Sequence, residues 1–134
     1  MKKSKTLLQL KAQALDAYSE LVKVIAEKEG KLSCYTCDAP LKNHTSNCQL
    51  GHYLSRGGYP GLTFHKNNSR LQCFRCNIHL RGNTVEFRVR LIDELGEEEV
   101  EALESNRHVP LKLSRTDYIE MIAEFRKQIK ELSQ

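Results

Sequence analysis

The sequence contains no apolar run that approaches the roughly 20 residues needed to cross a bilayer, so we expect no membrane-spanning segment. It also lacks the apolar region of a secretory leader, because Gln9, Lys11 and Gln13 interrupt the stretch that follows the basic start. We therefore expect a cytoplasmic protein. In that reducing compartment, the five cysteines favour metal binding over disulfide bonds.

Large apolar residues are also scarce in the central third of the chain. The 134 residues are enough for one domain with a modest core. A metal cross-link would add stability that such a small core does not supply by itself. We therefore expect a single compact domain, and the chain shows no internal repeat and no low-complexity segment.

Two Cys-x-x-Cys pairs are the candidates for this cross-link. At this spacing both sulfurs of a pair can reach one ion, and four thiolates complete the tetrahedral shell that zinc prefers. Such a shell leaves no open position, so we expect a structural zinc and not a catalytic one. The predicted ligands are Cys34, Cys37, Cys73 and Cys76. The fifth cysteine, Cys48, is expected to be a small buried residue.

Charge is distributed unevenly, although the net charge is only +4. Residues 50–90 contain seven basic residues and one acid, Glu86, whereas residues 91–134 contain six basic residues and eleven acids. A basic region around a polar loop suits a polyanion such as nucleic acid. An ordinary solvated surface explains the same charges equally well.

Apolar periodicity predicts helices on both sides of the central region. The first is expected over residues 6–28, after a basic arm at Lys2, Lys3 and Lys5. A short helix is expected over residues 97–104, and a last one from Ser114 or Thr116. The predicted apolar side of the first helix consists of Leu7, Leu10, Ala14, Tyr18, Leu21 and Ile25.

The central region predicts a β-hairpin followed by a helix. Strands are expected at residues 49–54 and 62–64, with a Gly-rich connection between them. The helix is expected to begin at Asn83, in a capping box with Glu86, and to end at Gly96. Its predicted apolar side consists of Val85, Val89, Ile92 and Leu95.

These elements together predict an α+β fold, with a small zinc-stabilised hairpin and helix flanked by long N- and C-terminal helices. The predicted segments are an N-terminal helix with its arm (1–30), a core (31–96) and a C-terminal helical extension (97–134). A hairpin with a His, then an Asn and a helix, pinned by two cysteine pairs, is the layout of ββα-metal, or HNH, nucleases.

In this layout, His52 would be the general base that takes a proton from water, because an imidazole pKa of about 6.5 suits this task. Asn68 would hold the imidazole in the correct tautomer by a hydrogen bond. A divalent metal, Mg²⁺ or Mn²⁺, would bind the phosphate and stabilise the leaving oxygen. The alternatives are that His52 is a surface or core residue and that Asn68 is a turn residue.

Several motifs of the central region carry a resemblance to a known family. They are Gly51-His52-Tyr53-x-Ser55-Arg56-Gly57, Leu62-x-Phe64, Asn68, Gln72-Cys73-x-x-Cys76-Asn77-x-His79, Gly82-Asn83 and Glu86-Phe87-Arg88-Val89. In this order and at this spacing they closely resemble the NinG (Rap) recombination proteins of phages. The resemblance implies a structure-selective DNA endonuclease that cuts branched intermediates such as Holliday junctions. For a phage-encoded chain, it implies the host cytoplasm.

By position, the resemblance assigns the base to His52 and the middle Asn of the HNH motif to Asn68. Asn77 stands where other HNH nucleases have their last metal-binding His. His79 matches a family His that would supply a metal ligand or a phosphate contact; the alternative is a surface histidine at the start of a helix. Gln49 stands where the family commonly has an acid, which is a better ligand for a hard cation than an amide is. Arg70 replaces a usual His.

Two further functions remain open at this point. One is a zinc-stabilised DNA-binding accessory protein without catalysis, which Gln49 favours. The other is a protein-interaction zinc ribbon, supported only by the acidic residues 97–104. For the DNA-bound functions, we expect branched or single-stranded DNA as partner. A homodimer would match the two-fold symmetry of a junction, although the two long helices can equally pack on each other. The predicted DNA contacts are Arg56, Arg70, Arg75, Arg81 and Arg88.

Overall fold

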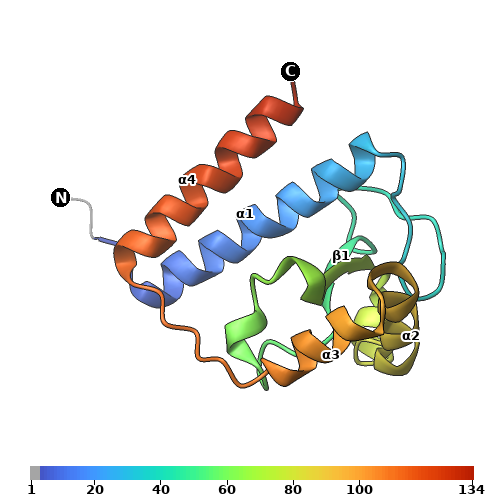
Figure 1. Cartoon of the computed structure of the whole chain (residues 1–134). Helices are drawn as coiled ribbons and strands as arrows, with labels where there is room; N and C mark the ends of the chain where they lie inside the picture. Colours follow the sequence, from blue (N-terminus) through green and yellow to red (C-terminus); the bar gives the residue numbers. More distant parts are fainter. Residues whose placement is uncertain (1–3) are drawn as a thin grey trace.

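The computed structural model describes residues 4–134 and shows an α+β protein, as the sequence predicts (Figure 1). Within these residues, four α-helices surround one two-stranded antiparallel sheet. Lys2 and Lys3 of the predicted basic arm lie outside the described residues. No helix in the part of the chain that the structure describes is both long and apolar enough to cross a membrane.

Helix α1 (Leu7–Lys28) confirms the first predicted helix. It begins after Thr6, whose hydroxyl accepts a hydrogen bond from the Gln9 N–H at 3.1 Å, while the Gln9 side chain accepts one from the Thr6 N–H at 2.9 Å. This capping box satisfies two backbone donors that the first turn leaves without a helical partner. The predicted apolar side is buried in its middle, whereas its end residues Leu7 and Ile25 are exposed.

Helix α4 (Arg115–Leu132) starts with a second capping box, formed by Ser114 and Asp117. It lies beside α1 and runs in the same direction (Figure 1). The rings of Tyr18 and Phe125 lie 5.3 Å apart between the two helices. The long helices therefore pack on each other, which is one of the two arrangements that the sequence allowed, and the homodimer stays a prediction. The buried residues between them are Leu10, Ala14, Tyr118 and Ile122.

The sheet consists of β1 (Gln49–His52) and β2 (Ser69–Gln72), with Gln49 opposite Gln72 and His52 opposite Ser69. The predicted first strand is confirmed over four residues. The predicted second strand at residues 62–64 is wrong: this region contains the 3-10 turns η1 (Pro60–Leu62) and η2 (Lys66–Asn68).

The error at residues 62–64 has a physical cause. Pro60 fixes its own φ at the start of η1 and suits a helical turn. The apolar residues there fill two separate cores instead of one face of a sheet: Leu62 packs with Phe87, and Phe64 packs against Tyr18. The turn also approaches the backbone after α3 so closely that a Cβ on Gly61 would overlap the carbonyl of Val109.

A short π-helix, η3 (Arg75–His79), leads into α2 (Thr84–Leu95). The predicted capping box of α2 is wrong: Asn83 has a left-handed backbone with φ +48°, and Glu86 binds Arg90 at 2.9 Å. Asn83 instead directs its amide towards the Cys76 sulfur, at 3.9 Å. The Asn83 side chain, which the sequence assigns to the helix cap, therefore contacts the cysteine cluster instead.

The predicted apolar side of α2 is also wrong in its first half. Val85 and Val89 are 80% and 56% exposed, whereas Phe87 and Leu91 are fully buried. The Phe87 ring lies between Tyr35 and Tyr53, at 5.4 and 5.7 Å. The residues of α2 that face these tyrosines are the ones that become buried. The tyrosines come from distant parts of the chain, so the local pattern of α2 does not predict its buried side.

Helix α3 (Glu97–Ser105) follows directly after Gly96, which has φ +92°, a conformation that favours glycine. Both its position and the end of α2 at Gly96 agree with the prediction. Val100 and Leu103 bury their side chains in the same core as Phe87. Residues 106–113 then return the chain to the start of α4.

Candidate functional site

The four predicted zinc ligands, Cys34, Cys37, Cys73 and Cys76, converge in the structure. Their sulfur atoms all lie within 4.8 Å of one another, and the sulfurs of Cys37 and Cys73 are 3.7 Å apart. Four sulfurs bound tetrahedrally at about 2.3 Å from one zinc ion are about 3.8 Å apart. The cluster therefore has the size to hold a zinc ion. Within residues 4–134 it is the only group of three or more His, Cys, Asp or Glu residues with this property.

Tight turns bring the two sulfurs of each pair together. In the first pair, the Cys34 N–H donates to the Ala39 carbonyl at 2.8 Å, and the Asp38 N–H donates to the Cys34 carbonyl at 2.9 Å. In the second pair, the Cys76 N–H points at the Cys73 sulfur at 3.4 Å. An N–H directed at sulfur favours the thiolate, which is the form that binds metal.

The thiols of the cluster have unequal proton affinities. Burial alone raises the pKa of Cys34, but hydrogen bonds from the backbone at Cys73 and Thr36 outweigh it and lower the pKa to about 6. Partial burial and hydrogen bonds to the neighbouring thiols raise the pKa of Cys37 to about 12. A divalent cation between the sulfurs offsets their mutual repulsion, so its binding releases protons and becomes tighter as pH rises.

Gln72 connects the cluster to the hairpin. Its Nε2 donates to the Thr36 hydroxyl at 3.0 Å and to the Gly82 carbonyl at 2.8 Å, and the Thr36 hydroxyl lies 3.5 Å from the Cys34 sulfur. Gln72 is completely buried. Strand β2, the first cysteine pair and the start of α2 are therefore joined through one side chain, a role that no sequence pattern indicated.

Gly51 makes room for this side chain. A Cβ on Gly51 would lie 1.9 Å from Gln72 Oε1, so we expect Gly51→Ala to force Gln72 out of its hydrogen bonds. The expected loss is about 1–3 kcal/mol in the free energy of unfolding, measured by urea denaturation of the zinc-loaded protein. Gly57→Ala is the matched control, because no atom lies within 4 Å of a Cβ there. Equal unfolding midpoints for the two variants would contradict this packing.

His52 lies at the end of β1 with its ring half-buried. Its Nε2 is 2.9 Å from the Thr63 carbonyl oxygen. A carbonyl only accepts hydrogen bonds, so Nε2 carries the hydrogen, and the neutral ring keeps its basic lone pair on Nδ1. Burial lowers the pKa of His52, and the charge of Arg56 lowers it further, against the opposing effect of the Thr63 carbonyl. The imidazole is therefore neutral at pH 7.

The prediction that Asn68 orients this imidazole is wrong. The Asn68 side chain is completely buried, and its Oδ1 accepts from the Leu54 N–H at 2.8 Å. Its Nδ2 donates to the carbonyls of Leu54 and Leu62, at 2.9 and 3.2 Å. Asn68 therefore joins the two ends of the loop that contains Thr63, and the Thr63 carbonyl orients the His52 ring. Sequence reasoning missed Thr63, because any residue can supply a backbone carbonyl.

The residues predicted to surround a second metal are only partly brought together. Asn77 Nδ2 donates to Gln49 Oε1 at 2.8 Å. Strand alternation places Gln49 and His52 on opposite faces of the hairpin, so this pair does not share a face with the imidazole. His79 is exposed, and its ring packs edge-on against Phe74 at 5.1 Å.

Two of the predicted DNA contacts form internal ion pairs. Arg70 binds Glu94 at 2.8 Å and lies over the Tyr35 ring, and Arg88 binds Glu104 at 2.9 Å. The Arg88 guanidinium holds the pKa of the Glu104 carboxyl below its ordinary value. Arg70 and Arg88 are thus not the free phosphate ligands that the sequence suggested.

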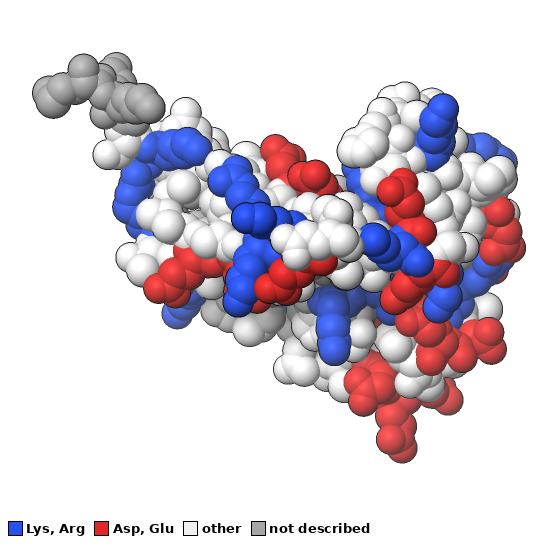
Figure 2. Space-filling model, turned by 90° about the horizontal axis from the view of Figure 1, so that it is seen from above, with Lys and Arg blue, Asp and Glu red and all other residues white. Residues whose placement is uncertain are grey.

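The other three predicted DNA contacts, Arg56, Arg75 and Arg81, are exposed, and none of them forms an ion pair within residues 4–134. Arg90 pairs with both Asp38 and Glu86. Basic and acidic side chains are interspersed over the face shown in Figure 2. The unbalanced charge of residues 50–90 is thus partly offset by acids from elsewhere in the chain.

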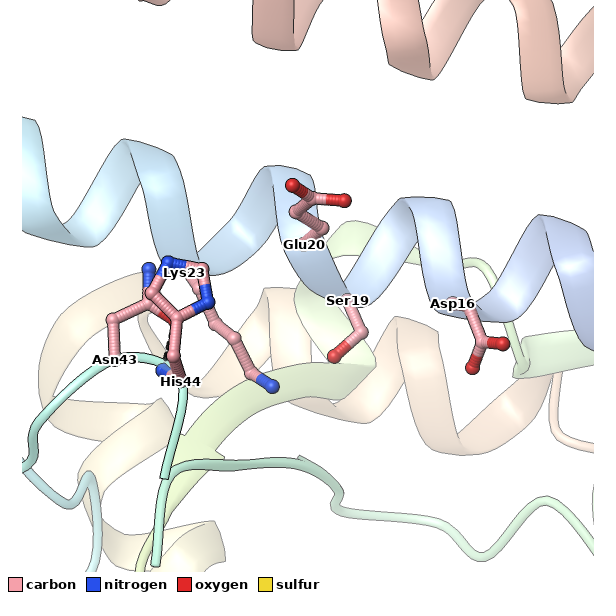
Figure 3. A pocket seen from close by; sticks show the side chains of 6 residues that line it. All are labelled: Asp16, Ser19, Glu20, Lys23, Asn43 and His44. Carbon is pink, nitrogen blue, oxygen red and sulfur yellow. Dashed lines mark hydrogen bonds between the residues drawn. The ribbon is translucent and has the colours of Figure 1, made fainter. Parts of the chain in front are cut away.

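A separate polar pocket of about 290 Å³ lies between α1 and the loop that precedes β1 (Figure 3). In Figure 3, Asn43 and His44 lie beside Lys23. None of the predicted site residues lines this pocket. Its acids and its histidine also do not form a metal-sized group within the described residues. The lining residues are Asp16, Ser19, Glu20, Lys23, Asn43 and His44.

The fold and the cysteine cluster define an α+β protein whose hairpin lies beside a four-cysteine site with the size for one zinc ion. The chain belongs to the NinG family: the family model described as Bacteriophage Lambda NinG protein matches residues 1–134.

Three relatives named Protein ninG show the extent of the similarity. The protein of Escherichia phage lambda is 32% identical over 120 residues, which cover 90% of this chain and 54% of that protein. The protein of Escherichia phage 933W is 34% identical over 96 residues, with 72% and 43% covered. The protein of Salmonella phage P22 is 30% identical over 120 residues, with 90% and 54% covered. The chain thus spans about half the length of these relatives. No solved structure matches it.

Proposed function

We propose that this protein is a structure-selective DNA endonuclease that hydrolyses phosphodiesters in branched recombination intermediates such as Holliday junctions. The observation that carries the proposal is the state of His52: its ring is neutral, held through Nε2, and left with its basic lone pair on Nδ1. A half-buried imidazole of this kind suits a general base.

The proposed reaction starts at Nδ1, the basic nitrogen of His52. Nδ1 of His52 takes a proton from a water molecule, and the water oxygen attacks the phosphorus atom. The bond to the leaving sugar oxygen breaks, and that oxygen takes up a proton from solvent. The Thr63 carbonyl keeps the ring oriented and stabilises the imidazolium that forms, because it already accepts the Nε2 hydrogen at 2.9 Å.

In this proposal a zinc ion bound by Cys34, Cys37, Cys73 and Cys76 has a structural role. Four thiolates occupy every tetrahedral position, so such an ion has no site for water or phosphate. It would fix the distance between the first cysteine pair and β2, through the Thr36 and Gln72 contacts.

The residues present fit a catalytic Mg²⁺ or Mn²⁺ poorly. Gln49 and Asn77 are neutral amides that already bond to each other, and hard cations prefer carboxylates. We therefore derive no step through such an ion. The lack of a suitable ligand set for Mg²⁺ or Mn²⁺ supports the second candidate function, a DNA-binding recombination accessory protein that does not cut.

Cleavage of a synthetic four-way junction, compared with linear duplex of the same sequence, tests the proposal. The zinc-loaded protein is assayed with Mg²⁺, with Mn²⁺ and without an added divalent ion. We expect the junction to be cut and the linear duplex to stay intact, and comparison of the three conditions shows whether cleavage requires an added ion. Binding without cutting under all three conditions would favour the accessory protein.

The pH profile of this cleavage is expected to follow the pKa of His52. The protein lowers this pKa below its ordinary value of 6.5, so the base is deprotonated throughout the neutral range and is lost only at more acidic pH. Arg56→Gln removes a charge that lowers the pKa, and it should move the acid limb to higher pH. A wild-type limb centred above pH 6.5, or one that Arg56→Gln leaves in place, would contradict this assignment.

A further inference from the structure

The second cysteine pair carries large apolar side chains that the fold leaves in solvent. Phe74, Ile78 and Leu80 are 41%, 50% and 41% exposed, at one end of η3, within it and directly after it. Other large apolar residues, such as Leu8 and Val85, are exposed too, but nowhere else in residues 4–134 do three lie so close together in the sequence. Exposure of three within seven positions therefore indicates a surface that contacts something other than water.

The aromatic part of this surface is rigid. The Phe74 N–H donates to Asn47 Oδ1 at 2.9 Å, and Phe74 is bonded to Cys73 of the cluster. Its ring packs edge-on against His79, at 5.1 Å and 74°. Little conformational entropy is thus lost when a flat ligand stacks on these rings.

The same surface has unpaired positive charge. Arg75 lies between two cysteines of the cluster and Arg81 follows Leu80, and neither forms an ion pair within residues 4–134. No acid occurs in the sequence between Asp38 and Glu86, and both of these acids pair with Arg90. Arg70 and Arg88, in contrast, are already neutralised by glutamates.

Exposed aromatic rings beside free guanidinium groups match the chemistry of single-stranded DNA, in which bases stack on rings and phosphates meet cations. We propose that Phe74 and His79 stack against unpaired bases of branched DNA, while Arg75 and Arg81 contact the adjacent phosphates. This inference rests on the proposed function and names the surface that would give it structure selectivity. In a linear duplex each base stacks on its neighbours, so its ring face is not accessible and this surface would not bind it.

The test compares the full zinc-loaded chain and its variants by fluorescence anisotropy. The probes are a labelled oligothymidylate of about 20 nucleotides, a splayed fork and a linear duplex, because single-strand sites cover roughly 4–16 nucleotides. Phe74→Ala is expected to weaken binding to the oligothymidylate and the fork by about fivefold or more, and binding to duplex by less than about twofold. Phe74→Tyr keeps a stacking ring and should bind as the wild type does.

Two further variants separate stacking from charge and from folding. Val85→Ala removes a side chain that is 80% exposed on α2, so it serves as the apolar control and should change no affinity. Arg81 has a left-handed backbone with φ +51°, which glycine adopts without strain. Arg81→Gly should therefore keep the melting temperature of the wild type. The slope of log affinity against log salt concentration for single-strand binding should fall by the amount that corresponds to about one phosphate contact.

Zinc content and melting temperature are measured for every variant. If Phe74→Ala keeps its zinc and binds all three probes as the wild type does, or weakens all three equally, the inference is overturned. Junction cleavage by the wild type, unchanged in Phe74→Ala, would leave the proposed nuclease intact and reject this surface alone. If the wild type binds none of the probes, the inference about this surface fails, and cleavage of the four-way junction still decides the proposed nuclease separately. If Phe74 is needed for the fork but nothing is cut, the surface holds and the nuclease fails.

Discussion

Replacing His52 by glutamine is expected to reduce junction cleavage by about 10²–10⁴-fold, the usual contribution of a general base. Glutamine can still donate a hydrogen bond to the Thr63 carbonyl, so the loop keeps its partner, but it has no basic nitrogen. His52→Ala should lose the same activity and also leave that carbonyl without its hydrogen bond. Cleavage rate, junction affinity and melting temperature are measured for both variants.

His108→Gln provides the matched control for this substitution. His108 is exposed in the connector before α4, with its ring 5.7 Å from that of Tyr59. We expect His108→Gln to cut as the wild type does. If His52→Gln retained wild-type cleavage, the imidazole would not be the base. Equal loss of cleavage and of junction affinity would point to a role in binding.

Cys73→Ser is expected to lower the zinc content from about one ion per chain to none and to unfold the middle of the protein. Binding of a structural zinc supplies roughly 10–16 kcal/mol, more than the stability of many small domains. Three cysteines of the cluster, Cys34, Cys73 and Cys76, also form half of the buried core around Leu41 and Leu71. Zinc analysis and thermal unfolding followed by circular dichroism measure both effects.

Partial helicity should survive this substitution, because α1 and α4 share a separate apolar cluster. Cys48→Ala is the matched control: Cys48 is buried in the same core but is not part of the four-sulfur group. It should keep the full zinc content and lose only a little stability. Unchanged melting and metal content in Cys73→Ser would show that the cluster holds no structural ion.

Features encoded within a few residues were predicted well from the sequence. The start of α1 and the end of α2 follow from Thr6 and Gly96, whose capping and turn preferences are local. The convergence of the cysteine pairs was also predictable, because each Cys-x-x-Cys forms its own turn and a single ion would join the two.

Features that depend on distant contacts were not predictable in this way. Ser69–Gln72 contains a single apolar residue and shows no strand pattern, yet it pairs with β1 because the loop above it is closed by Asn68. The buried side of α2 depends on Tyr35 and Tyr53. The charges of Arg70 and Arg88 are neutralised by glutamates that lie 16 to 24 positions further along the chain.

The sequence by itself thus determined the family, the four cysteines and the histidine that carries the proposed chemistry. Only the tertiary structure decided which nitrogen of His52 is basic, which arginines remain free and which apolar residues stay in solvent. The physical reason is that ligand identity and helix caps are properties of short segments. Protonation, ion pairing and burial instead depend on the groups that the whole fold brings within a few ångströms.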